Sequence, residues 1–438
     1  MAALKRYFFN HVILLPLKPF FALIGLLIYA GMVTVEPFRK IRVGIQKHAR
    51  IGAYGMTMEL FLRRRSIGSD VTADRVADYL RDIAQQSGSN IPRRSPDGKT
   101  AVPNDKRSVE VPKDFWIFLS REPANRQLMN MIKRRVVVIE HPLAWWIYDM
   151  MLKRYVVQSR FQPFIPGDLN DYSVWTGVPP QLTFTAEEEA KGLQLLKRIG
   201  IEPGIPFVCF HARDSVYLGH ALPGQDLNYH NFRDCEINNC LSAAEYIARQ
   251  GCFALRMGHK VEKNIETRDP RIIDYATRFR SDFGDIFLPA KCKFFLGSNS
   301  GLATIPLIFN RPVALTNVID ATGPATGSRD LTIFKRLWLI EKKRFMTFRE
   351  VIRWGVWTYG RHKQFAEARI EVIENSADEV LALAQEMNER LDGIWVGKDE
   401  DEDLQDRFHS LFPSDFPWNG FPGRIGAEFL RQNRELLD

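Results

Sequence analysis

Between residues 205 and 317, short apolar runs alternate regularly with segments of helical pattern. The apolar runs are IPFVCF, CFALRMG, KFFLGS and PVALTN. Helical stretches such as INNCLSAAEYIARQG and FGDIFLPAKC separate them. Strands that alternate with helices at this spacing form a parallel sheet covered by helices on both faces. The segment therefore predicts a doubly wound α/β domain whose last strand is PVALTN.

The N-terminal half repeats this alternation in a shorter form. KIRVGIQ, DFWIFLS and RRVVVIE are typical of strands, and MTMELFLRRR and NRQLMNMIK are typical of helices. The fold class is therefore α/β, with two doubly wound, Rossmann-like domains at residues 38–180 and 181–340. Residues 85–112 are rich in Pro, Gly and Ser and predict a flexible insert in the first domain.

Two helices carry clear start signals. Thr185 with Glu188, and Ser376 with Glu379, have the spacing of a capping box, and Gly200 follows the first of these helices as a stop. The second helix indicates a C-terminal helical extension over residues 341–438. Inside it, the five consecutive acidic residues 399–403 are typical of a solvated linker.

The front of the chain differs from the rest in charge and hydropathy. Residues 19–35 are uncharged and largely apolar, and residues 1–65 carry a net charge of +9 although the whole chain carries only +8. We interpret residues 1–37 as a membrane anchor, spanning or monotopic, whose basic flank meets anionic headgroups. A buried core helix is the alternative. The remaining chain, at a net −1, lacks the basic face that nucleic-acid binding requires.

The cysteines and histidines show no metal-binding or redox spacing. The five cysteines are an odd number without a C-x-x-C pair, and the nine histidines include no H-E-x-x-H motif. We therefore expect free cysteines in a reducing compartment, no metal and no cofactor.

Polar side chains follow three of the predicted strands in the second domain. These are His211-Ala212-Arg213-Asp214, Arg256-Met257-Gly258-His259, and Gly297-Ser298-Asn299-Ser300-Gly301. Doubly wound sheets bind ligands beyond the carboxyl ends of their strands, so the three loops are expected at one edge.

These loops carry the chemistry of a diphosphate site. Small residues at a strand–helix turn bring backbone N–H groups close to phosphate, and guanidinium forks pair with phosphate oxygens. An ordinary tight turn is the alternative for residues 297–301. The dinucleotide fingerprint and the Walker motif are absent, which argues against a dehydrogenase or an NTPase.

The same residues carry a family resemblance. The stretch from VCFHARDSVYL to IFNRPVALTN, with RIGAYGMTMELFLRRR near the front and RIGAEFLRQNRELLD at the end, is similar to a bacterial family of predicted glycosyltransferases. HARD resembles the His-x-Arg motif of fucosyltransferase-like enzymes, and CKFFLGSNSGLATIP resembles the donor-site segment of heptosyltransferases. In that segment Asp usually stands in place of Asn299. The resemblance implies a two-domain GT-B fold, a nucleotide-sugar donor and no metal.

From this resemblance we expect donor contacts at a set of residues in the second domain. They are His211, Arg213, Arg256, Gly258, Asp282, Ser298, Asn299, Ser300, Gly301 and Lys335, with Asp285 beside Asp282 as a further ribose or base ligand. For Lys335 a lone surface lysine is the alternative.

A metal-independent, inverting transfer also needs a general base. The candidates are Asp214, His48 and Glu59, in that order. Asp214 could instead pair with Arg213, His48 could face headgroups, and Glu59 could be a solvated helix residue.

The expected function is a membrane-associated glycosyltransferase of cell-envelope polysaccharide biosynthesis, at the cytoplasmic face of the bacterial inner membrane. It would move a sugar from a nucleotide-sugar donor to a lipid-linked or cell-surface glycan acceptor, with membrane lipids as further partners. A nucleotide-sugar epimerase of similar fold and a non-catalytic nucleotide- or glycan-binding assembly factor are the alternatives.

Overall fold

The computed structural model describes residues 18–38, 41–45, 50–67, 115–119, 123–157, 159, 161, 171–214, 228–319, 323–324 and 326–438. The chain divides into two compact units, Met1–Gly167 and Asp168–Asp438. The predicted insert at 85–112 lies outside the described residues.

The first unit contains a parallel sheet of three described strands in the order β1-β2-β3. The strands are β1 (Arg42–Ile45), β2 (Phe115–Leu119) and β3 (Val137–Glu140). The helices are α2 (Lys18–Val35), α3 (Ile51–Ser66), α5 (Arg126–Lys133), α6 (Pro142–Ile147) and α7 (Lys153–Val156), with a π-helix at Tyr148–Leu152. The three predicted strands and both predicted helices are confirmed.

In the described part of the first unit, no helix combines the length and the apolar character that crossing a membrane requires.

The second unit is built on a sheet of seven described strands, all parallel, in the order β13-β9-β8-β7-β4-β5-β6. The strands are β4 (Phe207–His211), β5 (Phe253–Arg256), β6 (Ile272–Asp274), β7 (Phe295–Ser298), β8 (Val313–Val318), β9 (Leu331–Phe334) and β13 (Arg424–Ile425). The predicted doubly wound sheet is present, but PVALTN is not its last strand, because β9 and β13 extend it.

Helices cover both faces of this sheet. They are α8 (Tyr172–Gly177), α9 (Ala186–Ile199), α11 (Leu241–Arg249), α12 (Tyr275–Arg278), α13 (Gly284–Lys291), α14 (Thr304–Ile308), α17 (Ala377–Asp392), α18 (Asp401–Ser410) and α19 (Ala427–Gln432). Two further helices of this unit are α15 (Phe348–Arg353) and α16 (His362–Glu367). Helices α11 and α17 pack on one another, and α13 packs on α9 and α14. Since right-handed crossovers leave β4 and β7 in opposite directions, α11 and α14 lie on opposite faces.

Both predicted capping boxes are confirmed. Thr185 accepts a hydrogen bond from the Glu188 N–H while the Glu188 carboxylate accepts one from the Thr185 N–H, and Ser376 and Glu379 make the same pair of bonds. Gly200 ends α9 with a φ of 94°, a left-handed conformation that favours glycine.

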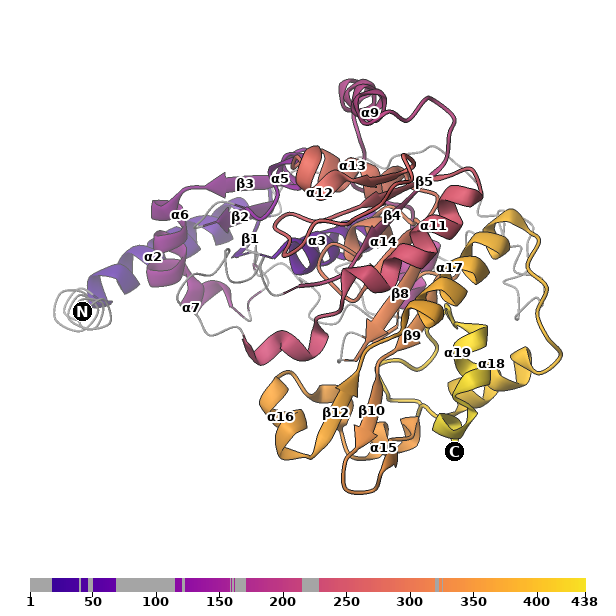
Figure 1. Cartoon of the computed structure of the whole chain (residues 1–438). Helices are drawn as coiled ribbons and strands as arrows, with labels where there is room; N and C mark the ends of the chain where they lie inside the picture. Colours follow the sequence, from indigo (N-terminus) through magenta and orange to yellow (C-terminus); the bar gives the residue numbers. More distant parts are fainter. Residues whose placement is uncertain are drawn as a thin grey trace, which may run out of the picture. The chain divides into compact units, whose positions relative to one another are not determined.

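A small antiparallel sheet lies between β9 and α17, where only helices were predicted. Its strands are β10 (Arg336–Leu339), β11 (Arg344–Phe345) and β12 (Ile370–Ile373), in the order β11-β10-β12. Figure 1 shows α15 and α16 beside β10 and β12. Leu337, Val356 and Phe365 of this region form a second hydrophobic cluster with Ile319, which directly follows β8, whereas Phe348 of α15 packs into the main core.

A buried asparagine pair joins the small sheet to the large one. The Asn317 N–H donates to Asn375 Oδ1 at 2.7 Å, and the Asn375 N–H donates to Asn317 Oδ1 at 2.8 Å. Asn375 Nδ2 also donates to the Phe334 carbonyl at 2.9 Å. The ends of β8, β9 and β12 are thereby held together.

Candidate functional site

The strand order places a ligand site at one point of the large sheet. From β4 the chain proceeds outward to β5 and β6, and then returns to β7 on the other side of β4. Doubly wound sheets bind ligands at the carboxyl ends of the two strands that flank such a reversal. Here those ends carry Arg213 and Ser298, and the Arg213 N–H donates to Ser298 Oγ at 2.8 Å. Two of the three predicted loops therefore meet.

Arg213 is fixed by the segment that follows the 3₁₀ helix Asn228–Arg233. Its guanidinium forms an ion pair with Asp234, and its carbonyl accepts a hydrogen bond from the Cys235 N–H at 3.0 Å. The side chain is largely buried and reaches a pocket at the carboxyl edge of the sheet.

Lys335 enters the same region from the end of β9. It is buried, and its Nζ donates to the Asp234 carbonyl at 2.6 Å. Burial lowers the pKa of Lys335, and nearby Arg213 and Arg233 lower that pKa further. Arg233 in turn donates to the Asn299 carbonyl at 3.0 Å. Three cationic side chains from separate parts of the chain thus surround Asp234, and Lys335 is not the lone surface lysine of the alternative interpretation.

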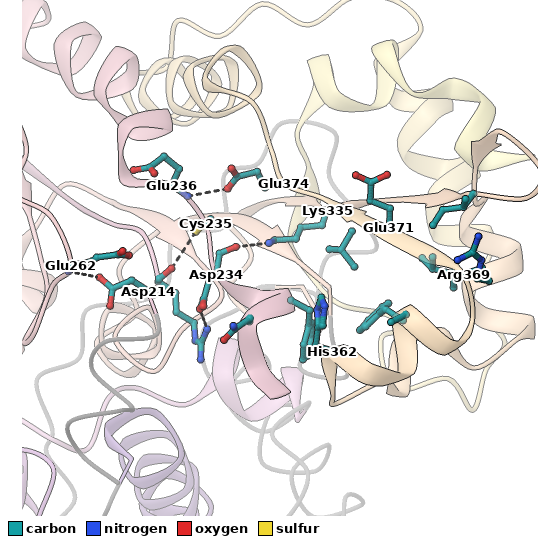
Figure 2. Close-up of a pocket in the computed structure, with 18 residues that line it drawn as sticks. Asp214, Asp234, Cys235, Glu236, Glu262, Lys335, His362, Arg369, Glu371 and Glu374 are labelled. Carbon is teal, nitrogen blue, oxygen red and sulfur yellow. Dashed lines mark hydrogen bonds and ion pairs between the residues drawn. The ribbon is translucent and has the colours of Figure 1, made fainter. Parts of the chain in front are cut away.

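Arg213, Asp234 and Lys335 line one end of a cavity of about 710 Å³. Its opposite wall comes from the small sheet and α16 and includes His362, Phe365 and Arg369. Figure 2 shows Lys335 pointing toward Asp234 between this wall and the end of β4. The cavity therefore lies between the large sheet and the small one.

Carboxylates line the rest of the cavity. Asp214 Oδ2 accepts a hydrogen bond from the Glu262 N–H at 3.1 Å, and Glu374 Oε2 accepts one from the Glu236 N–H at 2.9 Å. Glu371 also lines it. A cavity with cations at one end and carboxylates along its sides suits a ligand that has both an anionic group and hydroxyl groups. No set of three or more His, Cys, Asp or Glu within the described ranges is arranged to hold a metal ion.

The sequence analysis predicted a donor contact for Arg256. In the structure this side chain does not line the cavity and is enclosed by other residues. Its guanidinium is 2% exposed, forms an ion pair with Asp274 at 3.1 Å and donates to the Lys263 carbonyl at 3.0 Å. Its donor role stays a prediction, and in this structure it joins β5 to β6. Gly258 follows it at a tight turn, where a Cβ would lie 2.6 Å from a methyl group of Val261.

His211 lies between the two arginines at the end of β4. Its Nδ1 is 3.1 Å from the Met257 carbonyl. Burial lowers the pKa of His211 to about 4, and both Arg256 and Arg213 contribute in the same direction. The imidazole is therefore neutral at pH 7. Its Nδ1–H group donates the hydrogen bond that the Met257 carbonyl accepts.

Asp282 and Asp285 bind Arg280 and do not line the cavity. Arg280 lies 2.5 Å from Asp282 and 2.8 Å from Asp285. Burial raises the pKa of Asp285 to about 7, and the Tyr275 hydroxyl lies 3.2 Å from its carboxylate.

The predicted turn at residues 297–301 differs from expectation in one respect. Helix α14 begins at Thr304 instead of Gly301, and it has only five residues. Ser300 Oγ accepts a hydrogen bond from the Ala303 N–H at 3.4 Å, and the Asn299 N–H donates to the Thr316 carbonyl at 3.2 Å. The turn therefore offers Ser298 at the reversal point but no long helix behind it.

The other two proposed bases belong to the first unit. Glu59 is fully buried on α3 and forms an ion pair with Arg63 at 2.7 Å, with both side chains at 0% exposure. It is not the solvated helix residue of the alternative interpretation. His48 lies outside the described residues.

Several cavity residues were absent from the sequence prediction. Asp234, Glu236, Glu374, His362 and Arg369 line the cavity, and none of them directly follows a predicted strand. One signal was available: Asp234 and Glu236 stand in RDCE, inside the stretch that carries the family resemblance.

Comparison with known proteins finds similar solved structures but no match to a family model or a curated protein. A glycosyl transferase family 9 protein of Veillonella parvula DSM 2008 matches with 9% identity, a TM-score of 0.34, and coverage of 68% of this chain and 86% of that chain. The E. coli ADP-heptose lps heptosyltransferase II matches with 10% identity, a TM-score of 0.33, and coverage of 68% of this chain and 90% of that chain. Both of these proteins are glycosyltransferases by name.

Proposed function

We propose that this chain is a glycosyltransferase that moves a sugar from a nucleotide-sugar donor to a lipid-linked or cell-surface glycan acceptor. The observation that carries the proposal is the group of three cations, Arg213, Arg233 and Lys335, at the carboxyl edge of a doubly wound sheet.

The cationic end of the cavity suits a diphosphate. In the described structure Lys335 Nζ makes one hydrogen bond, to the Asp234 carbonyl, although an ammonium group has three donors. Its burial beside Arg213 makes an anion at this position favourable, because a phosphate oxygen would offset the desolvated positive charge. Arg213 would supply a guanidinium fork to the same group.

The acidic sides of the cavity suit the sugar and ribose. Asp214, Glu262 and Glu371 can accept hydrogen bonds from ligand hydroxyls, and Phe365 offers an apolar contact. We propose this wall, which the small sheet supplies in part, as the element that selects the donor.

The reaction is proposed as a direct displacement. An acceptor hydroxyl oxygen bonds to the anomeric carbon while the bond from that carbon to the diphosphate oxygen breaks. The leaving diphosphate takes the electron pair and is stabilised by Arg213 and Lys335. Asp214 is the proposed base for the hydroxyl proton, since its carboxylate lines the cavity beside Arg213.

The first unit is the proposed acceptor side. A lipid-linked acceptor would place the reaction at the cytoplasmic face of a bacterial inner membrane, in keeping with the net charge of +9 in residues 1–65. No metal takes part in the proposed displacement.

The experiment that tests the proposal is thermal denaturation of the full chain with a panel of nucleoside diphosphates and nucleotide sugars. We expect at least one to raise Tm, and Lys335→Met to abolish the rise. The matched control is Lys197→Met, which removes an exposed lysine on α9. The proposal is contradicted if no nucleotide raises the Tm of the wild type. It is also contradicted if the nucleotide raises the Tm of Lys335→Met as much as that of the wild type.

Sugar transfer distinguishes the remaining functions. With the stabilising donor and a lipid extract, a transferase forms a glycosylated lipid, whereas an epimerase converts the free donor. A binding factor does neither.

A further inference from the structure

Helix α2 is apolar around its whole circumference, but the described part of the chain covers only one side of it. After Lys18 the helix contains no charged residue. Phe21, Gly25 and Met32 are buried, and they recur at the spacing of a single helix face. A helix without a polar face normally has apolar surroundings on every side.

The covered side fixes α2 to the first unit. Phe21 packs edge-on against Trp146 with a centroid distance of 5.1 Å, and the Tyr155 hydroxyl donates to the Ala22 carbonyl at 2.9 Å. At Gly25 the two backbones are so close that a Cβ would lie 2.0 Å from the Met151 carbonyl oxygen. The orientation of α2 about its own axis is therefore determined, and so is the side that it presents outward.

The outward side is a continuous apolar surface. It consists of Phe20, Leu23, Leu26, Leu27 and Val33, which are all exposed, and we call it the outer face of α2. Single exposed apolar residues are ordinary on protein surfaces, but a contiguous row marks a contact with another apolar phase. Leu143 and Val157, at the two ends of the helical segment that packs on α2, are exposed as well.

Basic side chains lie on a helix that packs on α2. Lys153 and Arg154 are exposed on α7, and Trp146 and Tyr155 contact α2 on its covered side. Lysine, arginine and such aromatic residues favour the headgroup region of a bilayer. A second copy of the chain would bring two basic surfaces together, whereas anionic lipid would neutralise one.

We infer that the outer face of α2 is a lipid-binding surface, through which the first unit lies on an anionic membrane with α2 in the plane of the interface. The outer face enters the boundary between headgroups and acyl chains, while the covered face stays on the protein. This binding mode does not depend on the proposed transferase activity.

Co-sedimentation of the full chain with vesicles tests the inference. We expect binding to vesicles of phosphatidylcholine mixed with phosphatidylglycerol, and weaker binding to phosphatidylcholine alone. The variant Leu23→Ser/Leu26→Ser/Leu27→Ser should bind the mixed vesicles about a thousandfold more weakly, because each of the three leucines contributes roughly tenfold to partitioning.

The matched control carries Leu193→Ser, Ile205→Ser and Ile394→Ser in the second unit. These side chains are 57%, 42% and 64% exposed, against 55%, 47% and 64% for Leu23, Leu26 and Leu27, so a similar apolar area is removed elsewhere. Wild-type binding by the control is expected. Unchanged vesicle binding by the triple variant overturns the inference. The inference is also overturned if, without vesicles, the wild type is a dimer and the triple variant is a monomer.

A second measurement keeps the test valid if the triple variant does not fold. Leu27→Trp should be quenched by brominated acyl chains in the mixed vesicles beyond the wild-type background, whereas Ile394→Trp should not. Equal quenching of the two variants overturns the inference. Loss of nucleotide binding in Lys335→Met leaves both lipid measurements unchanged.

Discussion

Arg213 and Arg256 lie at the carboxyl ends of two neighbouring parallel strands, and each guanidinium forms an ion pair with an aspartate. The surroundings of the two side chains differ. Arg256, at the end of β5, is closed in by Asp274 and the Lys263 carbonyl. Arg213, beyond the end of β4, lines a cavity of about 710 Å³ together with its partner Asp234. The strand order explains the difference, because β4 stands at the reversal of the chain and β5 lies one strand away from it. Position in the sheet, more than residue type, therefore decides whether an arginine reaches a cavity or is enclosed by the fold.

The largest expected effect is on stability. Arg256→Ala leaves Asp274 buried without its cation and should cost about 3–5 kcal/mol of unfolding free energy. Arg213→Ala should cost about 1 kcal/mol or less, because the Asp234 side chain is 24% exposed and can be solvated. Urea denaturation of both variants measures the difference. Equal losses would show that the two pairs are both structural.

A smaller effect is expected on ligand affinity. Asp234→Asn frees Arg213 from an anionic partner and should tighten binding of the stabilising nucleotide by up to about fivefold, since a partly exposed ion pair is worth up to about 1 kcal/mol. Asp274→Asn is the matched control at the other arginine, and its folded protein should bind with unchanged affinity. Calorimetric titration measures both. Weaker binding by Asp234→Asn would mean that the aspartate, and not Arg213, contacts the ligand.

A pH-dependent effect concerns His211, whose pKa is lowered mainly by burial and further by both arginines. Its pKa in the folded protein, about 4, lies below the ordinary 6.5, so folding favours the neutral imidazole. The stability contribution is therefore complete above about pH 6.5 and is lost as the pH falls toward 4. Unfolding free energies at several pH values should show a shallower decline in His211→Gln than in the wild type over this window. Parallel declines would show that folding does not lower the pKa of His211.

Local patterns predicted the parts of the fold that depend on neighbouring residues. The capping boxes at Thr185 and Ser376 are confirmed because their donors and acceptors lie three residues apart. The strands β4, β5, β7 and β8 are confirmed because buried parallel strands are continuous apolar runs. Residues 341–438 were predicted to be helical, but the short strands of the small sheet depend on pairing between β10 and β12, which lie far apart in sequence.

Contacts between residues far apart in sequence explain why the sequence did not predict the burial of the acidic run or the full lining of the cavity. Asp401, in the run taken for a solvated linker, is buried in an ion pair with Arg431 at 2.5 Å. Arg213 and Ser298 were predicted to share an edge because parallel strands end together. Asp234 and His362 could not be placed, because only the folded small sheet brings α16 opposite the end of β4.

The small sheet supplies one wall of the cavity and is joined to the large sheet by several contacts. The asparagine pair holds the ends of both sheets together, and Phe348 packs against Phe334 with ring centroids 5.3 Å apart. His362 and Arg369 are exposed on the cavity wall and take no part in these contacts. Substitutions at these two positions can therefore alter the shape of the cavity without disturbing the strands of the large sheet. Such an arrangement makes ligand preference evolvable: the exposed side chains of this wall can diverge, or be exchanged by design, while the proposed anion-binding edge stays unchanged.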